Sequence, residues 1–162
     1  MIATLDSAMY QLGQVFLAPV LITIALVFAY AFYALGAFLW QGWQRRGRRS
    51  GGFELIALWR AQPALSQQDL ELIALQRLDV ARIITRVAPM LGLVATMIPM
   101  GPALRALGNG QMSDVSQALA IAFSAVILAL ISASITYTIL NVRRRWYAAE
   151  LSEVDKQRQE SA

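Results

Sequence analysis

The sequence predicts an all-α integral membrane protein with three transmembrane helices. Three apolar segments carry this prediction, at about 15–40, 87–105 and 115–142, and none has a charge in its interior. A helix rises 1.5 Å per residue, so each segment can cross a hydrocarbon core about 30 Å thick. Composition agrees, because 57% of the residues are hydrophobic and 15% are charged, against about 25% charged in soluble proteins. We expect a single membrane domain over residues 1–162.

The basic residues predict the orientation of the spans. Of the 14 Lys and Arg residues, only Arg105 lies outside the loop 41–86 and the tail 143–162. Cytoplasmic segments are enriched in Lys and Arg, so we expect both regions inside the cell, the N-terminus outside and the C-terminus cytoplasmic. The formal charge of +4 has the same origin, and we therefore expect no nucleic acid as a partner.

Span 1, about 15–40, is richest in aromatic residues toward its second half. Trp40 and Trp43 fit an interfacial aromatic belt, while Pro19 lies near the start of the span, where a missing N–H costs least. A Gly-rich basic linker, QRRGRRSGG, follows and contains Arg45, Arg46, Arg48 and Arg49.

The sequence of the expected cytoplasmic loop 41–86 predicts two helices. The first covers Phe53–Gln62 and ends before Pro63. Ser66 is a good N-cap for the second, with Asp69 in its first turn, and apolar residues then recur up to Ile84. We expect this helix to run from Gln67 into span 2, and span 3 to continue similarly into the tail, so both extend into the cytoplasm. The charges of the loop are those of a solvated face, and its apolar stripe must pack on another helix of this chain or of a neighbouring subunit.

Span 2, about 87–105, contains two prolines that remove helical hydrogen bonds. Pro99 and Pro102 predict a kinked or partly unwound outer third. Such backbone persists in lipid only where neighbouring groups satisfy the freed carbonyls, so this face is expected inside an assembly. Thr96 precedes the prolines. From its residue type alone, we expect its hydroxyl to form a hydrogen bond to the backbone of its own helix.

Span 3, about 115–142, carries two stripes. Ala125, Ala129 and Ala133 recur every four residues, which allows close helix contact. A neighbouring face carries a stripe of hydroxyl residues, Ser116, Ser124, Ser132 and Thr136. The pattern leaves two roles open for this stripe, which either lines a water path or joins helices. The basic triplet at 143–145, followed by Trp146 and Tyr147, is expected to anchor the tail at the inner membrane surface, with a lipid-specific or partner-specific role as the alternative.

Several chemistries are excluded by the residues that are missing. The chain has no His and no Cys, and no span contains an Asp or Glu. It therefore lacks the usual metal ligands, nucleophiles and bases, and we expect neither an enzyme nor a cofactor or metal site. Any proton handling must use hydroxyls, water or a partner's residues.

Span 2 and span 3 resemble the MotA/TolQ/ExbB proton channel family. Residues 88–96, APMLGLVAT, are similar to the family's A-P-x-x-G-L-x-G-T. Residues 117–119, QAL, with Tyr137 further on, are similar to its E-A-L…Y-N. A short-loop branch similar to ExbB is indicated by residues 96–104, 122–124 and 143–147, which read TMIPMGPAL, AFS and RRRWY.

The resemblance implies a subunit of a proton-motive-force-driven motor in the cell inner membrane. It implies a homo-oligomer, a pentamer, around a dimer of a single-span ExbD/TolR-like partner whose membrane Asp carries the proton, with work directed to transport, including protein transport, or to the envelope. Thr96 matches the family's second-span Thr. Thr96 and Ser124 are then expected on the ion path, with further pore-lining candidates at Ser116, Gln117, Ser132 and Thr136.

The chain departs from the family pattern at several of these positions. Gln117 stands where the family has Glu, and Ala95 where it has Gly. Ala125 and Val126 replace both threonines of A-F-S-T-T. The alternative is therefore a non-conducting oligomeric scaffold of the same fold, and a small holin-like pore former fits the topology alone.

Overall fold

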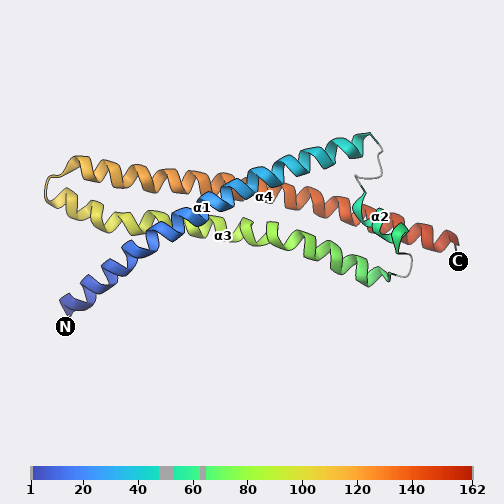
Figure 1. The fold of residues 1–162 in the computed structure, drawn as a ribbon, viewed down its shortest axis with the longest axis horizontal. Helices are drawn as coiled ribbons and strands as arrows, with labels where there is room; N and C mark the ends of the chain where they lie inside the picture. Colours follow the sequence, from blue (N-terminus) through green and yellow to red (C-terminus); the bar gives the residue numbers. More distant parts are fainter. Residues whose placement is uncertain (1, 48–52, 63–64, 162) are drawn as a thin grey trace. The chain divides into compact units, whose positions relative to one another are not determined.

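Four helices make up the part of the chain that the computed structural model describes, which is residues 2–47, 53–62 and 65–161 (Figure 1). Helix α1 is Ile2–Arg46, α2 is Glu54–Ala61, α3 is Gln67–Gly108 and α4 is Met112–Ser161. None of the described residues is in a strand, and α1, α3 and α4 are each long and apolar enough to cross a membrane. The all-α prediction with three spans is confirmed. Arg48, Arg49 and Pro63 of the predicted loop lie outside the described residues.

The helices of spans 2 and 3 continue past their apolar segments, as predicted. Helix α3 begins at Gln67, immediately after the predicted cap. The Ser66 Oγ accepts a hydrogen bond from the Asp69 N–H at 3.2 Å, and the Asp69 carboxylate accepts from the Ser66 N–H at 3.0 Å. These reciprocal bonds form a capping box. The hydrogen bonds from Ser66 also lower the pKa of Asp69 below its usual value, which keeps the carboxylate charged at the helix N-terminus.

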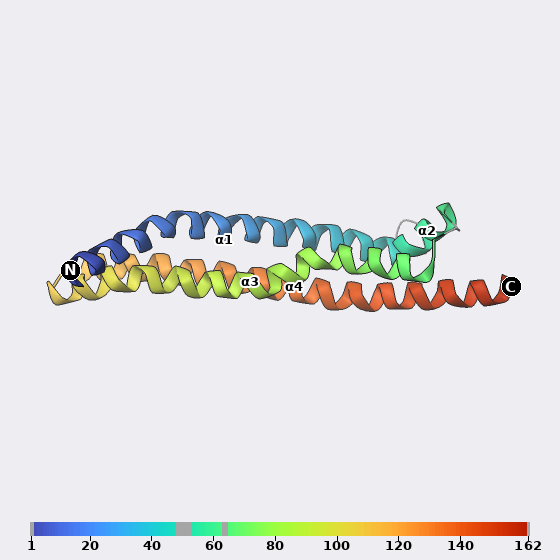
Figure 2. The same cartoon turned by 90° about the horizontal axis from the view of Figure 1, so that it is seen from below.

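A turn of three residues joins α3 to α4 (Figure 2). The Gln111 N–H donates to the Ala106 carbonyl at 2.9 Å, and the Gly110 N–H donates to the Leu107 carbonyl at 3.1 Å. This is a Schellman motif, which needs a left-handed residue at its C′ position. Gly110 supplies it with a φ of 75°.

The helices group into two compact units. Unit 1 is Met1–Ala31 with Ile84–Ser134, and unit 2 is Phe32–Ile83 with Ile135–Ala162. Helices α1, α3 and α4 each contribute to both units, whereas α2 belongs to unit 2 alone. The expectation of a single folding domain stays a prediction.

Unit 1 has a core of small residues. Ile24 of α1, Ala95 of α3, and Ala125 and Ala129 of α4 form one buried cluster. A Cβ added at Gly92 would lie 3.0 Å from the Ala129 Cβ, so α3 and α4 approach as closely as glycine allows. The predicted alanine stripe is thus a helix contact, which we call the α3–α4 interface.

Unit 2 has a core of larger residues. Leu55 of α2, Ala74 and Leu78 of α3, and Tyr147 of α4 are buried together. Beside them, Phe38 of α1 stacks on Trp146 of α4 with ring centroids 5.2 Å apart. The predicted apolar stripe of the loop helix therefore packs on helices of its own chain.

Helix α3 runs unbroken through Pro99 and Pro102. The unwinding that these prolines allow is therefore absent from the helix as described, and a kink at either residue stays a prediction. Pro99 is buried and Pro102 half-buried, so both lie against protein rather than on the open side of α3.

Much apolar surface stays uncovered in a single chain. Within the most apolar 18-residue window of each long helix, 11% of residues are buried in α1, 22% in α3 and 28% in α4. Large exposed apolar surface in a soluble monomer is unfavourable, so this surface must face lipid or other subunits.

Candidate functional site

The two predicted ion-path hydroxyls, Thr96 and Ser124, lie beside the α3–α4 interface. Each directly adjoins one of its buried alanines, Ala95 on α3 and Ala125 on α4. The Thr96 hydroxyl donates to the Leu93 carbonyl at 2.7 Å, and the Ser124 hydroxyl donates to the Ala120 carbonyl at 2.8 Å. Both are outside the core, with Ser124 exposed and Thr96 partly exposed. Each oxygen thus keeps lone pairs available for a proton donor outside the chain.

The structure does not bring Thr96 and Ser124 into one groove of a single chain. Ser124 lines a groove of about 390 Å³ between α1 and α4, together with Leu21 and Ile24. Thr96 is not among the residues that line this groove. A path that uses both hydroxyls therefore extends beyond this groove.

The other pore-lining candidates divide into two pairs. Ser116 and Gln117 are exposed near the start of α4. Ser132, in unit 1, and Thr136, in unit 2, are both 0% exposed. The Ser132 hydroxyl donates to the Leu128 carbonyl at 2.7 Å. In this chain the second pair lies inside helix packing, and a pore-lining role for any of the four stays a prediction.

The alanine that replaces a family threonine has a structural explanation. Ala125 is 3% exposed within the unit 1 core, next to Ala129, which is itself 1% exposed. Ala125 shares this buried cluster with Ala95 and Ala129, so a β-branched hydroxyl side chain at position 125 would have to displace its neighbours. Position 125 therefore serves close packing in this protein, and Ser124 is the neighbouring hydroxyl that reaches the surface.

Unit 2 contains a buried carboxylate that the sequence reasoning did not single out. Glu150 of α4 is 2% exposed and forms an ion pair with Arg45 of α1. Its other oxygen accepts a hydrogen bond from the Leu55 N–H at 2.7 Å. That N–H belongs to the first turn of α2, where Phe53 provides no side-chain cap. Glu150 thus substitutes for the missing cap and joins α1, α2 and α4.

A second carboxylate, Glu54, completes what we call the polar cluster. Glu54 accepts from the Gln41 side-chain amide at 2.9 Å and from the Tyr147 hydroxyl at 3.1 Å, and it forms an ion pair with Arg77. The cluster comprises Gln41, Arg45, Glu54, Arg77, Tyr147 and Glu150. All four helices contribute to it, so it fixes the short helix α2 within unit 2.

A comparison with protein families decides the class of this chain. The sequence profile of the MotA/TolQ/ExbB proton channel family matches residues 62–156, more than half of the chain. The chain belongs to the MotA/TolQ/ExbB proton channel family. The match covers all of α3 and most of α4, and therefore the whole α3–α4 interface and both ion-path hydroxyls. The sequence resemblance is confirmed at the level of the family. No curated protein and no solved structure matches the chain.

In this member of the MotA/TolQ/ExbB family, part of the polar cluster lies outside the matched range. Gln41, Arg45 and Glu54 precede residue 62, whereas Tyr147 and Glu150 fall within the match. One signal in the sequence pointed to Glu150. It shares a helix face with Tyr147 and Val154 at spacings of three and four, so a carboxylate falls on a stripe that is otherwise buried.

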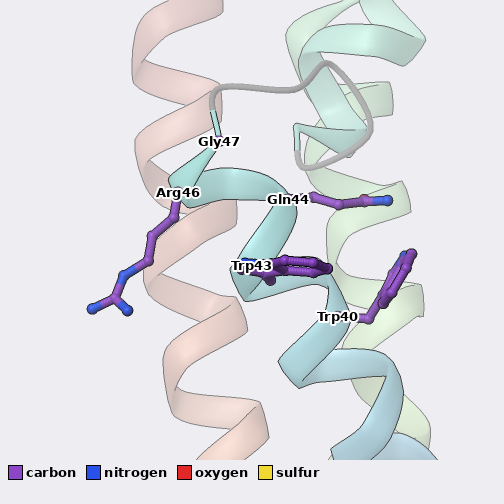
Figure 3. A pocket seen from close by; sticks show the side chains of 5 residues that line it. All are labelled: Trp40, Trp43, Gln44, Arg46 and Gly47. Carbon is purple, nitrogen blue, oxygen red and sulfur yellow. The ribbon is translucent and has the colours of Figure 1, made fainter.

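The end of α1 carries the predicted interfacial aromatics of this family member. Trp40 and Trp43 are 61% and 70% exposed and meet edge to face with centroids 5.8 Å apart. Together with Gln44, Arg46 and Gly47 they line a pocket of about 430 Å³. Figure 3 shows Trp40 and Gln44 directed to one side of the helix and Arg46 to the other. The pocket therefore has no convergent set of polar groups.

Proposed function

We propose that this chain is the pore-forming stator subunit of an ExbB/TolQ-type motor, driven by the proton motive force, in the cell inner membrane. Several copies, five by family resemblance, surround the membrane helices of a single-span ExbD/TolR-like partner. Protons move along the boundary between subunit and partner past Thr96 and Ser124, and the resulting motion powers transport, such as protein transport, or envelope work. The basic regions 41–86 and 143–162 face the cytoplasm.

The family match over residues 62–156 is the observation that carries this proposal. The surface of α3 supports it. Met90, Leu93, Met97, Met100 and Leu104 are each at least half exposed and recur at spacings of three and four, which places them on one helix face. Thr96 flanks this face and supplies a hydroxyl beside an otherwise apolar surface. A stripe of this kind suits a contact with further copies or with a partner's helix.

The proton carrier has to come from the partner. The three spans contain no Asp, Glu or His, so this chain has no carboxylate or imidazole at membrane depth to carry the proton. A carboxylic acid on a partner helix is expensive to place in a bilayer, and hydroxyls or water around it reduce that cost. Thr96 and Ser124 are surface hydroxyls that adjoin the α3–α4 interface, and we assign them this task.

Replacement of Thr96 by Val tests the proposal. The change removes the hydroxyl and nearly conserves the shape of the side chain. We expect proton flux into liposomes that contain the chain and its single-span partner to fall about tenfold, as the loss of a hydrogen bond of about 1–1.5 kcal/mol implies. Flux is followed with a pH-sensitive dye trapped inside the vesicles.

Thr23 provides a matched control on α1. Its exposed hydroxyl also bonds to its own helix, at 2.7 Å to the Pro19 carbonyl, but it lies outside the family match. Thr23→Val should leave the flux unchanged, and Thr96→Ser should restore most of it. An assembled Thr96→Val complex with normal flux would show that Thr96 has only a structural role.

A non-conducting scaffold of the same fold is the second candidate. The replacement of both family threonines by Ala125 and Val126 favours it, because the third span presents two hydroxyls fewer to any path than the family pattern has at this point. The same vesicles separate the two functions. A scaffold assembles with the partner but gives no flux above that of empty vesicles, with or without the partner's membrane carboxylate.

A further inference from the structure

An open groove beside the polar cluster contains two buried polar atoms without partners. The groove has a volume of about 550 Å³ and lies wholly in unit 2, between α1, the start of α2, and α4. Its polar wall is Gln41, Gln44, Glu54 and Arg143. Its apolar wall runs along α1 and consists of Phe32, Tyr33, Gly36, Ala37 and Trp40. The volume far exceeds the roughly 30 Å³ that one water occupies, so the groove can hold a larger ligand.

The first unsatisfied atom is a hydrogen-bond acceptor. Gln41 is 5% exposed, and its Oε1 has no partner within the described part of the chain. The orientation of this amide is fixed, because its Nε2 donates to the Glu54 carboxylate, which only accepts. A group that fills the groove must therefore bring a donor to Gln41 Oε1, since an unmet buried acceptor is costly.

The second unsatisfied atom is a donor on a positive charge. The buried Nε of Arg143 also lacks a partner among the described residues. The ion pairs of the polar cluster join Arg45 to Glu150 and Arg77 to Glu54, so both carboxylates are already neutralised. Arg143 adds an excess positive charge to the groove, and a guanidinium binds phosphate with matched geometry.

The surroundings place the groove at a membrane surface. The aromatic end of span 1, with Trp40, forms one wall, and the basic triplet begins at Arg143. Tyr33 is 77% exposed and continues the apolar wall along α1. Acyl chains suit such a wall, while the donor and the phosphate belong at its polar end.

We propose that this groove binds one phospholipid with a phosphoethanolamine headgroup. The ammonium donates to Gln41 Oε1 beside Glu54, the phosphate accepts from Arg143, and the acyl chains follow α1 from Trp40 toward Phe32. A choline headgroup has no N–H and cannot satisfy Gln41. A purely anionic headgroup brings no charged donor to the two acceptors at this end of the groove, Gln41 Oε1 and the Glu54 carboxylate.

Lipid binding to the purified full-length chain tests this assignment. Native mass spectrometry counts bound dihexanoyl phosphatidylethanolamine, phosphatidylcholine and phosphatidylglycerol in separate titrations. We expect one phosphatidylethanolamine per chain, held about tenfold more tightly than phosphatidylcholine of the same chain length. Equal binding of these two lipids, tighter binding of phosphatidylglycerol, or no bound lipid because another subunit fills the groove would each overturn the proposal.

Two variants and one control locate the site. Gln41→Leu should abolish the preference for phosphatidylethanolamine over phosphatidylcholine. Arg143→Gln should lower the binding affinity for both lipids about tenfold. Arg144→Gln removes the same charge from the adjacent exposed residue, which lines a different pocket with Tyr147 and Leu151. It should stay within twofold of the unaltered chain. An equal loss in Arg143→Gln and Arg144→Gln would mean general charge attraction and no site. The lipid comparison in the unaltered chain decides the question even if a variant fails to fold.

Discussion

Gly92 sets the distance between α3 and α4. The atoms nearest to a Cβ built at this position are the Ala129 Cβ at 3.0 Å and the Val126 Cα at 3.6 Å. Neither can rotate away, because one is a single methyl and the other is backbone. Alanine is already tight there, and any larger residue must push the helices apart.

Gly92→Val should therefore destabilise the protein by about 1–3 kcal/mol, the usual cost of overpacking. Gly36→Val is the matched control, since a Cβ at Gly36 meets nothing within 4 Å. Thermal unfolding in detergent, followed by circular dichroism, measures both. A melting temperature for Gly92→Val as high as that of the control would mean that α3 and α4 do not pack as closely as described.

At the residue scale, spacing predicted the small side chains better than the polar ones. Ala125 and Ala129 were expected at a helix contact because they recur every four residues, and they are buried there. Glu150 was missed because charges beyond a membrane span are ordinarily solvated. Its burial depends on Arg45, which is 105 residues away in the sequence, and on a backbone N–H of α2. The helix face that Glu150 shares with Tyr147 and Val154 indicates its burial, but no local pattern identifies its distant partners.

Among the elements, α2 depends most on its surroundings. It has eight residues, too few for a stable isolated helix. Its first turn is held by Glu150, and its buried residue Leu55 packs against α3 and α4. Loss of a contact in the polar cluster should therefore destabilise α2.

Glu150→Ala should cost about 3–5 kcal/mol, because it leaves Arg45 half-enclosed without its counter-charge and removes the acceptor for the Leu55 N–H. Hydrogen exchange measured by mass spectrometry should show much faster exchange across Glu54–Ala61. Glu153→Ala, at an exposed position one turn away, should change neither stability nor exchange. Unaltered exchange in α2 after the Glu150 change would contradict the capping role.

The sequence predicts the long helices well, but it predicts less well whether a helix continues through a proline. The cap at Ser66 and the apolar periodicity beyond it predicted the start of α3 at Gln67. The prolines indicated partial unwinding, yet α3 remains helical to Gly108. Local rules give the hydrogen bonds that a proline removes, but tertiary packing decides whether the helix continues past it.

For the whole molecule, the orientation in the membrane is open to a direct test. The chain has no Cys, so a single introduced Cys is the only site for a thiol label. Ser113 and Ser152 are both exposed and lie near opposite ends of α4. They therefore serve as reporters for the two sides of the membrane.

A membrane-impermeant maleimide should label Ser113→Cys in cells whose inner membrane is intact and whose outer membrane, where there is one, has been made permeable. Ser152→Cys should react only after the inner membrane is opened. This outcome follows from the basic regions on the cytoplasmic side. The reverse labelling pattern would refute the proposed orientation, and labelling of both sites in intact cells would mean that the preparation is leaky.

The turn between α3 and α4 offers little surface for recognition by another protein. Only Asn109, Gly110 and Gln111 join two helices of more than forty residues each. In the proposed orientation, this hairpin tip is too small to offer a docking surface to another protein in the periplasm. We therefore propose that the single-span partner makes the contact with a distant client. Exchanging that partner's outer portion should redirect the motor to a new client without any change in this chain.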